Sequence, residues 1–169
     1  MTPNLKTKPG KIKLLALDVD GVLTDGTIRL NGENRETKVF FVQDGSALIR
    51  ARKAGLLIAW ISGRRCRAVE LRAGELGVEY LYQGVEDKVG VIENLLDEKG
   101  LNWEQIAFIG DDLNDLPLIR KAGWSAAVAQ AHPGVLAAAD YQTTLPGGRG
   151  AVREVVELIL KAKGIEPDY

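Results

Sequence analysis

Cysteine and histidine are almost absent from this sequence, which has one of each among 169 residues. A single cysteine, Cys66, excludes an internal disulfide and is typical of a protein from a reducing compartment. No histidine lies close to it in the sequence, so we expect Cys66 to have a packing role rather than act as a nucleophile. The one histidine, His132, precedes Pro133, and we interpret it as a helix-entry residue.

Long apolar runs and an excess of charge are also missing. No apolar run approaches the roughly 20 residues that a membrane-spanning helix needs. The first ten residues are polar and include two prolines, which predicts a flexible arm rather than a signal peptide. With 22 basic and 23 acidic side chains, the net charge is −1, so nothing attracts nucleic acid or an anionic membrane. We expect a cytoplasmic protein with neither as a partner.

The sequence does contain a regular alternation of strand and helix patterns along a single domain, residues 1–169. Several strand patterns are continuously apolar, as in sheets covered on both faces. The alternation predicts an open, mostly parallel, Rossmann-like α/β sheet with helices on both sides. The expected strands are 12–18, 56–61, 79–83, 106–110, 125–128 and 140–144. The expected helices are 44–54, 65–76, 86–99, 113–122, 133–138 and 149–163, and the glycines expected to end helices are Gly55, Gly77, Gly100 and Gly123.

One segment, residues 26–42, departs from this alternation. Two strand-like stretches, 27–33 and 37–42, flank the turn signal Asn31-Gly32, and together they predict a β-hairpin. The second stretch is apolar on both faces from Val39 to Val42, which a lone exposed hairpin could not tolerate in water. We therefore expect the hairpin to pack on the core or on another subunit.

The first predicted strand ends in two carboxylates, Asp18 and Asp20, followed by Gly21. Strand side chains alternate, so both aspartates leave the strand end on the same side. Two like charges placed together are costly unless a cation or a developing charge uses them. The pair suits a nucleophile beside an acid/base, or a metal site.

Further polar residues follow other predicted strands, at the sheet edge where open α/β proteins bind ligands. Together they offer carboxylates, a hydroxyl, backbone N–H groups and cations, which can hold a phosphate and Mg²⁺. Asp112 could also simply cap the helix that begins near Leu113. These residues are Ser62, Gly63, Arg64, Lys88, Asp111, Asp112, Asn114 and Asp115.

The order Asp-x-Asp, Ser-Gly-Arg, Lys and Gly-Asp-Asp-x-x-Asp resembles the four motifs of the haloacid dehalogenase superfamily of phosphatases. A narrower likeness, covering residues 11 to about 164, is to the 3-deoxy-D-manno-octulosonate 8-phosphate phosphatase family. This narrower likeness rests in addition on Leu-Tyr-Gln-Gly at 81–84 and on Gly-Gly-Arg-Gly-Ala-Val-Arg-Glu at 147–154. Ser62 stands where many relatives have threonine, and Gln130 where they often have aspartate.

The resemblance implies a role for each motif residue. Asp18 would be the nucleophile that forms an aspartyl-phosphate, and Asp20 the acid/base for the sugar alkoxide and then for water. Mg²⁺ would be held by Asp18, the backbone carbonyl of Asp20 and Asp111. The residues implied to bind the phosphoryl group are Ser62 and Lys88, with Arg64 and Arg72 as contacts for the sugar-acid carboxylate.

The resemblance also implies an assembly. The gaps that hold cap domains in larger relatives contain only the hairpin and single helices here, so the site should be open. In this family the hairpins join a homotetramer, and the C-terminal segment near 147–150, at the start of a tail and helix over 145–169, reaches a neighbouring site.

Three other interpretations stay open. The substrate could be a nine-carbon, sialic-acid-type sugar 9-phosphate, although Arg64 favours the octulosonate because the nine-carbon relatives tend to have an acidic residue there. A non-enzymatic receiver domain uses similar residues, but in a different order along the chain. A catalytically idle oligomerisation domain does not fit four intact motifs.

Overall fold

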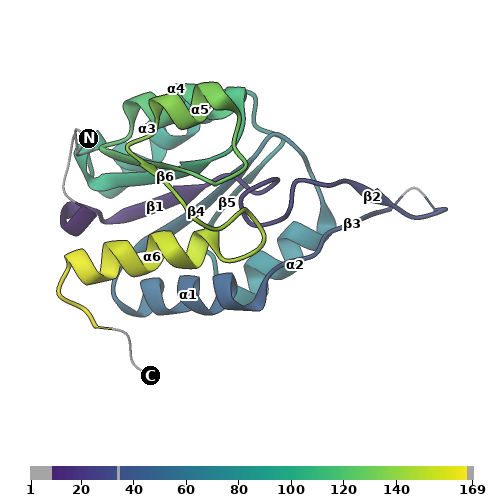
Figure 1. The fold of residues 1–169 in the computed structure, drawn as a ribbon, viewed down its shortest axis with the longest axis horizontal. Helices are drawn as coiled ribbons and strands as arrows, with labels where there is room; N and C mark the ends of the chain where they lie inside the picture. The colour runs from purple at the N-terminus through teal and green to yellow at the C-terminus, as the bar shows by residue number, and fades with distance from the viewer. Residues whose placement is uncertain (1–8, 34, 167–169) are drawn as a thin grey trace.

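The computed structural model describes residues 9–33 and 35–166, and it places a parallel six-stranded sheet at the centre of the molecule (Figure 1). The strand order is β5-β4-β1-β6-β7-β8, with every neighbouring pair parallel. This confirms the predicted open α/β sheet. The strands are β1 Leu14–Leu17, β4 Leu57–Ser62, β5 Tyr80–Gln83, β6 Ile106–Gly110, β7 Trp124–Ala127 and β8 Tyr141–Gln142.

Strand β1 lies between β4 and β6, and all four of its residues are buried. Leu17 pairs with Trp60 on one side and with Ile109 on the other. Because the register is parallel, the residues that follow these strands emerge at the same edge of the sheet. The first carboxylate, Asp18, therefore lies between the ends of two neighbouring strands.

Helices cover both faces of the sheet. Figure 1 shows α1, α2 and α6 on one side and α3, α4 and α5 on the other. None of the helices in the described ranges is long and apolar enough to span a lipid bilayer. The helices are α1 Val42–Lys53, α2 Arg67–Leu76, α3 Lys88–Lys99, α4 Leu116–Lys121, α5 Pro133–Ala138 and α6 Ala151–Ala162.

Three of the four glycines expected to end helices follow a helix with a positive φ, namely Gly55, Gly77 and Gly100. Gly77 and Gly100 adopt the left-handed conformation directly after α2 and α3, as predicted. Gly123 has no positive φ. A Cβ there would lie 2.6 Å from the Cα atom of Glu104, so this position requires glycine for close approach of two backbones rather than for a helix cap.

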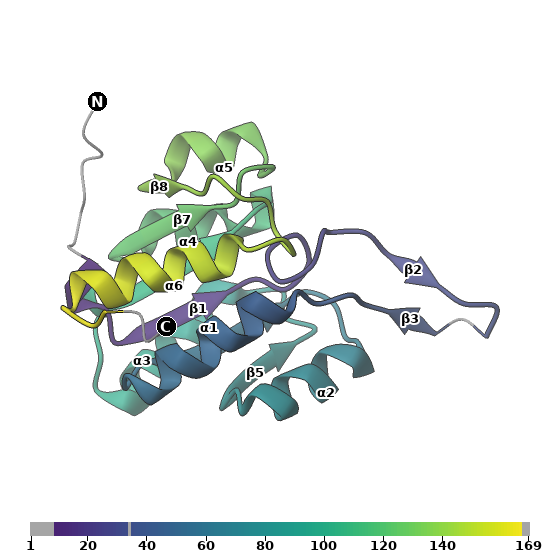
Figure 2. The ribbon, with the colours of Figure 1, turned by 60° about the horizontal axis from the view of Figure 1, so that its bottom comes forward.

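The predicted hairpin forms, but its strands are short. Strands β2 Arg29–Leu30 and β3 Glu36–Thr37 pair antiparallel and project from the body of the molecule (Figure 2). The expected strand over 37–42 is wrong beyond Thr37, because Val42 already begins α1. Phe40 is half-buried and stacks on Trp60, with ring centroids 6.3 Å apart.

Most apolar side chains of the hairpin segment do not pack on the core of their own chain. Ile28, Leu30, Val39 and Val42 are 52%, 61%, 56% and 72% exposed. Of the two expected packing partners, the chain's own core is thus excluded for these four residues. A second subunit remains a prediction.

The first and last elements of the described chain, η1 (Pro9–Lys11) and α6, pack on each other and on the body of the molecule. Residues 1–8 of the expected flexible arm lie outside the described residues, whereas η1 is a 3-10 helix beside the end of α6. At the other end of α6, the buried carboxylate of Asp44 in α1 accepts hydrogen bonds from the N–H groups of Gly150 and Arg153. Asp44 thereby caps α6, whose own N-cap residue has no side chain.

The segment expected to reach a neighbouring site lies against its own chain. The Gly148 N–H donates to the carbonyl of Val22 at 2.9 Å. A Cβ at Gly147 would lie 1.7 Å from the carbonyl oxygen of Gly21, so only glycine fits there. Residues 147–150 thus support the loop that follows Asp20 of the same chain, and a contact of the C-terminal segment with a neighbouring site stays a prediction.

Candidate active site

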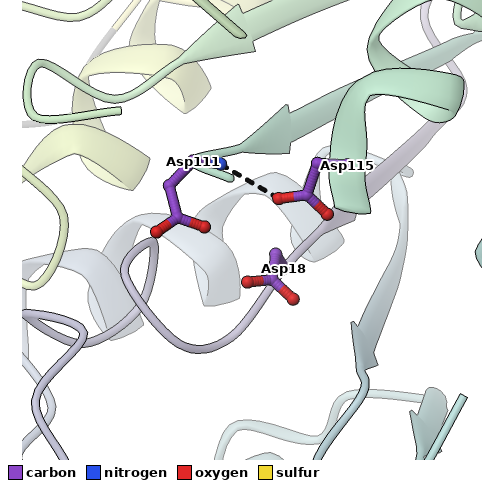
Figure 3. A group of neighbouring side chains, drawn as sticks. All are labelled: Asp18, Asp111 and Asp115. Atoms are coloured by element: carbon purple, nitrogen blue, oxygen red, sulfur yellow. Dashed lines mark hydrogen bonds between the residues drawn. The ribbon is translucent and has the colours of Figure 1, made fainter. Parts of the chain in front are cut away.

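Three carboxylates meet at the carboxyl edge of the sheet. Asp18 follows β1, while Asp111 and Asp115 follow β6 (Figure 3). One oxygen from each of the three lies within 4.8 Å of the other two. Asp18 is 6% exposed and Asp115 is completely buried. Asp111 is half-buried, and three acidic groups this close together, two of them buried, require a compensating positive charge.

Lys88, the first residue of α3, supplies part of that charge. Its Nζ lies 2.7 Å from Asp18 Oδ1 and 2.8 Å from Asp115 Oδ1. Burial lowers the pKa of Lys88, but the neighbouring carboxylates outweigh burial and raise it above its ordinary value. The ammonium therefore stays charged.

Asp115 connects Lys88 to the loop that carries Asp111 and Asp112. Its second oxygen, Oδ2, accepts the N–H of Asp111 at 3.0 Å (Figure 3) and the N–H of Asp112 at 3.5 Å. Because Lys88 donates to the other oxygen, both oxygens of Asp115 accept hydrogen bonds inside the protein. Asp112 caps the 3-10 helix η3, Leu113–Asp115, by accepting the N–H of Leu113 at 2.7 Å, which confirms its capping role.

The single positive charge of Lys88 does not balance three carboxylates. As a result, the pKa values of Asp18 and Asp111 are both raised. Burial, reinforced by the charge of Asp115, raises the pKa of Asp18 to about 7 although Lys88 opposes this. Burial and the charges of Asp18 and Asp115 raise the pKa of Asp111 to about 8. A bound divalent cation would relieve this repulsion.

The donor atoms fit Mg²⁺, a hard cation that takes carboxylate and carbonyl oxygens. Asp18 and Asp111 keep carboxylate oxygens that Lys88 does not bind. In the described part of the chain, no group donates a hydrogen bond to the carbonyl of Asp20. A Cβ at Gly21, which has φ +87°, would lie 1.9 Å from Asp111 Oδ2, so glycine is needed to admit this carboxylate.

Mg²⁺ binding is therefore expected to depend on pH. Because the pKa values of Asp18 and Asp111 are raised to about 7 and 8, protons compete with the cation below pH 8. We expect the Mg²⁺ dissociation constant to fall at least about tenfold from pH 6 to pH 8. Calorimetry in two buffers with different ionisation heats should also show proton release. Equal affinity at both pH values, without proton release, would contradict this account.

The carboxylates open onto a cavity of about 210 Å³ that contains most of the predicted site residues. Ser62, at the end of β4, is buried, and its Oγ accepts the N–H of Arg64 at 3.1 Å. The Ser62 hydroxyl, the turn at Gly63 and the Arg64 guanidinium thus line the same cavity as Asp18 and Asp111. The lining residues are Asp18, Asp20, Gly26, Ser62, Gly63, Arg64, Asp111, Asp112 and Asn114.

The sequence analysis missed two residues next to this cavity, Glu36 and Lys38. Lys38 Nζ forms a hydrogen-bonded ion pair with Asp20 and lies 2.6 Å from Glu36 Oε1. Glu36 Oε2 accepts a hydrogen bond from Arg64 at 2.8 Å. Glu36 is in β3 and Lys38 directly follows this strand, 16 and 18 positions after Asp20, and no spacing rule links either residue to Asp20.

Three predicted site residues do not line the cavity. Lys88 and Asp115 lie behind it and are hydrogen-bonded to Asp18 and Asp111, whereas Arg72 has no such link to the site. Arg72 lies in α2, where its Nη1 pairs with Glu75 at 2.8 Å. Its Nη2 packs so closely on α1 that a Cβ at Gly45 would lie 2.4 Å away. Within one chain Arg72 does not reach the cavity. A substrate contact would therefore require Arg72 of one chain to reach the cavity of a second copy.

The remaining sequence predictions concern structural residues. Cys66 is buried and its thiol is free, as expected for a packing role. His132 accepts the N–H of Gly134 at 3.0 Å and caps α5, which confirms the helix-entry interpretation. Gln130 donates to the carbonyl of Gly21 at 2.8 Å and accepts the N–H of Gly147 at 2.9 Å. Its amide therefore joins the loop after Asp20 to the C-terminal segment.

Comparison with known proteins agrees with this geometry. Residues 81–153 match the haloacid dehalogenase-like hydrolase family. The 3-deoxy-D-manno-octulosonate 8-phosphate phosphatase of Salmonella typhimurium is 44% identical over 164 residues, which are 97% of this chain and 87% of that protein. The corresponding protein of Yersinia pestis is 45% identical over 156 residues, 92% of this chain and 83% of the relative.

Solved structures show the same likeness. A 3-deoxy-D-manno-octulosonate 8-phosphate phosphatase from Moraxella catarrhalis, in complex with magnesium, phosphate and the sugar acid KDO, superposes with a TM-score of 0.93 at 44% identity. The match covers 97% of this chain and 94% of that one. The Yersinia pestis phosphatase superposes with a TM-score of 0.92 at 44% identity, covering 95% and 86% of the two chains.

Proposed function

The chain belongs to the 3-deoxy-D-manno-octulosonate 8-phosphate phosphatase family of haloacid dehalogenase-like hydrolases, and on this premise we propose that it hydrolyses that sugar phosphate to KDO and inorganic phosphate. One observation carries the proposal. A buried aspartate, Asp18, is held by Lys88 close to the carboxylate of Asp111 and opens onto a cavity that Asp20 also lines. This arrangement supports phosphoryl transfer through a covalent aspartyl intermediate.

In the first half-reaction, a carboxylate oxygen of Asp18 attacks phosphorus, and the bond from phosphorus to the sugar oxygen breaks. The Asp20 carboxyl donates its proton to the departing alkoxide. Ser62 and Lys88 donate hydrogen bonds to the phosphoryl oxygens, whose negative charge grows in the transition state. Bound Mg²⁺ would supply Lewis-acid charge that reduces repulsion between the nucleophile and the phosphate.

In the second half-reaction, the Asp20 carboxylate removes a proton from water. The water oxygen bonds to phosphorus, the bond from phosphorus to Asp18 breaks, and inorganic phosphate leaves. Asp20 is then protonated again for the next cycle. Both half-reactions need one carboxyl group beside the phosphoryl group, and Asp20 lines the cavity that would hold that group.

Arg64 is proposed to bind the substrate's carboxylate. Its side chain is 47% exposed at the cavity, and Glu36 binds only its Nη2 atom. The other guanidinium N–H groups remain available for a bidentate contact with a sugar acid. Asp112 and Asn114 line the same cavity and would support the loop around the metal.

A panel of sugar phosphates tests the proposed substrate. With Mg²⁺ present, we expect phosphate release to be fastest from 3-deoxy-D-manno-octulosonate 8-phosphate and slower from a nine-carbon sialic-acid-type 9-phosphate or a hexose phosphate. EDTA should abolish release from all three. Faster turnover of the nine-carbon compound would transfer the assignment to that substrate, and no release from any of them would refute the phosphatase function.

We further propose a homotetramer in the cytoplasm. The free thiol of Cys66 supports a reducing compartment. The exposed apolar residues of the hairpin support contact with a second copy of the chain. Such a contact would also help to close a site whose cavity has exposed residues such as Asp112 in its lining.

A substitution in the hairpin is expected to break this assembly. Leu30 is 61% exposed, so Leu30→Asp should leave the fold of one chain intact but bury a charge in a hairpin contact. Light scattering at micromolar concentration should show a tetramer for the wild type and smaller species for the variant. Ile165→Asp, the control at an exposed apolar position after α6, should leave the mass of the assembly unchanged. A monomeric wild type would contradict the proposal.

A further inference from the structure

The hairpin places a buried lysine beside the proposed acid/base. The side chain of Lys38 is 1% exposed, and its ammonium binds one oxygen each of Asp20 and Glu36. Lysine is almost never fully buried unless it is paired. Holding a charge out of water is costly, so two carboxylates around one ammonium form a built arrangement rather than a chance surface pair.

Lys38 controls the position of the Asp20 carboxylate. Asp20 lies in the loop after β1, and among the described residues only Lys38 donates a hydrogen bond to its side chain. That bond uses Oδ1, which leaves Oδ2 to exchange a proton with the leaving group or with water. Without Lys38, no described residue would hold the Asp20 carboxylate in place by a hydrogen bond.

The same lysine connects Asp20 to the rim of the cavity. Glu36 bridges Lys38 and Arg64 through its two oxygens, at 2.6 Å and 2.8 Å, and its side chain is 11% exposed. The network therefore runs from the proposed proton donor to the proposed carboxylate-binding arginine. Glu36 lies in β3 and Lys38 directly follows this strand, so the second arm of the hairpin holds both Asp20 and Arg64.

We propose that Lys38 is a positioning residue for the phosphatase reaction: it holds Asp20 so that Oδ2 delivers the proton to the departing sugar oxygen. The inference rests on the proposed function. Lys38 acts through Asp20 and contacts no reacting atom. The hairpin then has a role within its own chain, in addition to any role in assembly.

Leaving groups of different basicity test this role. An alkyl phosphate, such as the sugar-acid phosphate, needs a proton on its departing oxygen, whereas p-nitrophenolate departs without one. The ratio kcat/KM reports the steps up to formation of the aspartyl-phosphate, where this difference arises. A lysine that merely supported the fold would, when lost, slow both substrates by the same factor.

The experiment compares Lys38→Met with the wild type on 3-deoxy-D-manno-octulosonate 8-phosphate and p-nitrophenyl phosphate. We expect kcat/KM for the sugar phosphate to fall at least about 30-fold, within the range of general-acid effects, and that for the aryl phosphate to change less than about threefold. Lys38→Arg, which keeps the charge and the donors, should restore most of the lost rate. The exposed Lys53→Met is the matched control and should behave as the wild type.

Two outcomes would overturn the inference: an equal loss on both substrates, or no loss on the sugar phosphate. Lys38→Gln, whose amide still donates one hydrogen bond, carries the same ratio test if Lys38→Met does not fold. An inactive wild type would instead refute the proposed function. The two failures are therefore distinguishable.

Discussion

Asp18→Asn is expected to lower phosphate release by at least about 10⁴-fold, because loss of a nucleophile removes the covalent route altogether. The amide has nearly the same shape as the carboxylate, and Lys88 keeps Asp115 as a partner at 2.8 Å. The fold should therefore survive. Phosphate release from the sugar phosphate in saturating Mg²⁺ measures the loss, and Asp97→Asn, an exposed aspartate of α3, is the matched control.

The same variant should be more stable than the wild type in EDTA. The pKa of Asp18 is raised from 3.8 to about 7, so the folded state binds this proton more tightly than the unfolded state does. Ionisation of Asp18 therefore costs stability as pH rises from about 4 to 7, and the full cost is present above 7. Asn cannot ionise, so its advantage in thermal unfolding should grow between pH 5 and pH 8.

Either half of this result can fail separately. More than about 1% residual turnover would contradict the assignment of Asp18 as the nucleophile. A lower unfolding temperature than the wild type at pH 8 in EDTA would contradict the electrostatic account of the site. Residual turnover would not bear on the electrostatic account of the site. A lowered unfolding temperature would not bear on the role of Asp18 as the nucleophile.

The strand-end part of the site could be predicted because local sequence determines it. Asp18, Ser62 and Asp111 each follow or end a buried apolar strand, and parallel register brings such residues to one edge of the sheet. Lys88 begins the helix after β5, so it lies at that edge as well. No side-chain contact had to be known to place these four.

The hairpin part could not be predicted, because non-local packing determines it. In the sequence Lys38 is one charged residue among many, and only the return of residues 35–41 to the cavity brings it to Asp20. Arg72 shows the reverse case. The family resemblance implied a substrate contact for Arg72, but the packing of α2 against α1 directs its guanidinium toward Gly45 of the same chain.

The boundaries between elements were the other source of error. Val39 to Val42 are apolar and β-branched or aromatic, which favours a strand. Their burial pattern overrides that preference, since Phe40 packs on Trp60 while Val42 starts α1. Tertiary contacts decided the outcome there, and a single sequence does not show them.

Lys88→Met is expected to inactivate the protein and also to destabilise it strongly. Lys88 is the cation that pairs with both Asp18 and Asp115, which are themselves close to Asp111. Removing it leaves buried carboxylates without a partner, which typically costs about 3–5 kcal/mol of folding free energy. Urea unfolding at pH 8 in EDTA should show this loss, while the exposed Lys53→Met should change the free energy of unfolding by less than about 0.5 kcal/mol.

A second substitution separates the two effects of Lys88. In Lys88→Met/Asp115→Asn, one buried negative charge is gone, and the side-chain amide oxygen introduced at position 115 can still accept the N–H of Asp111. We expect the double variant to recover a large part of the lost stability but none of the activity, because no cation faces the phosphoryl group. Recovery of turnover would show that Lys88 only balances charge. Failure to recover stability would show that packing, not charge, dominates its contribution to folding.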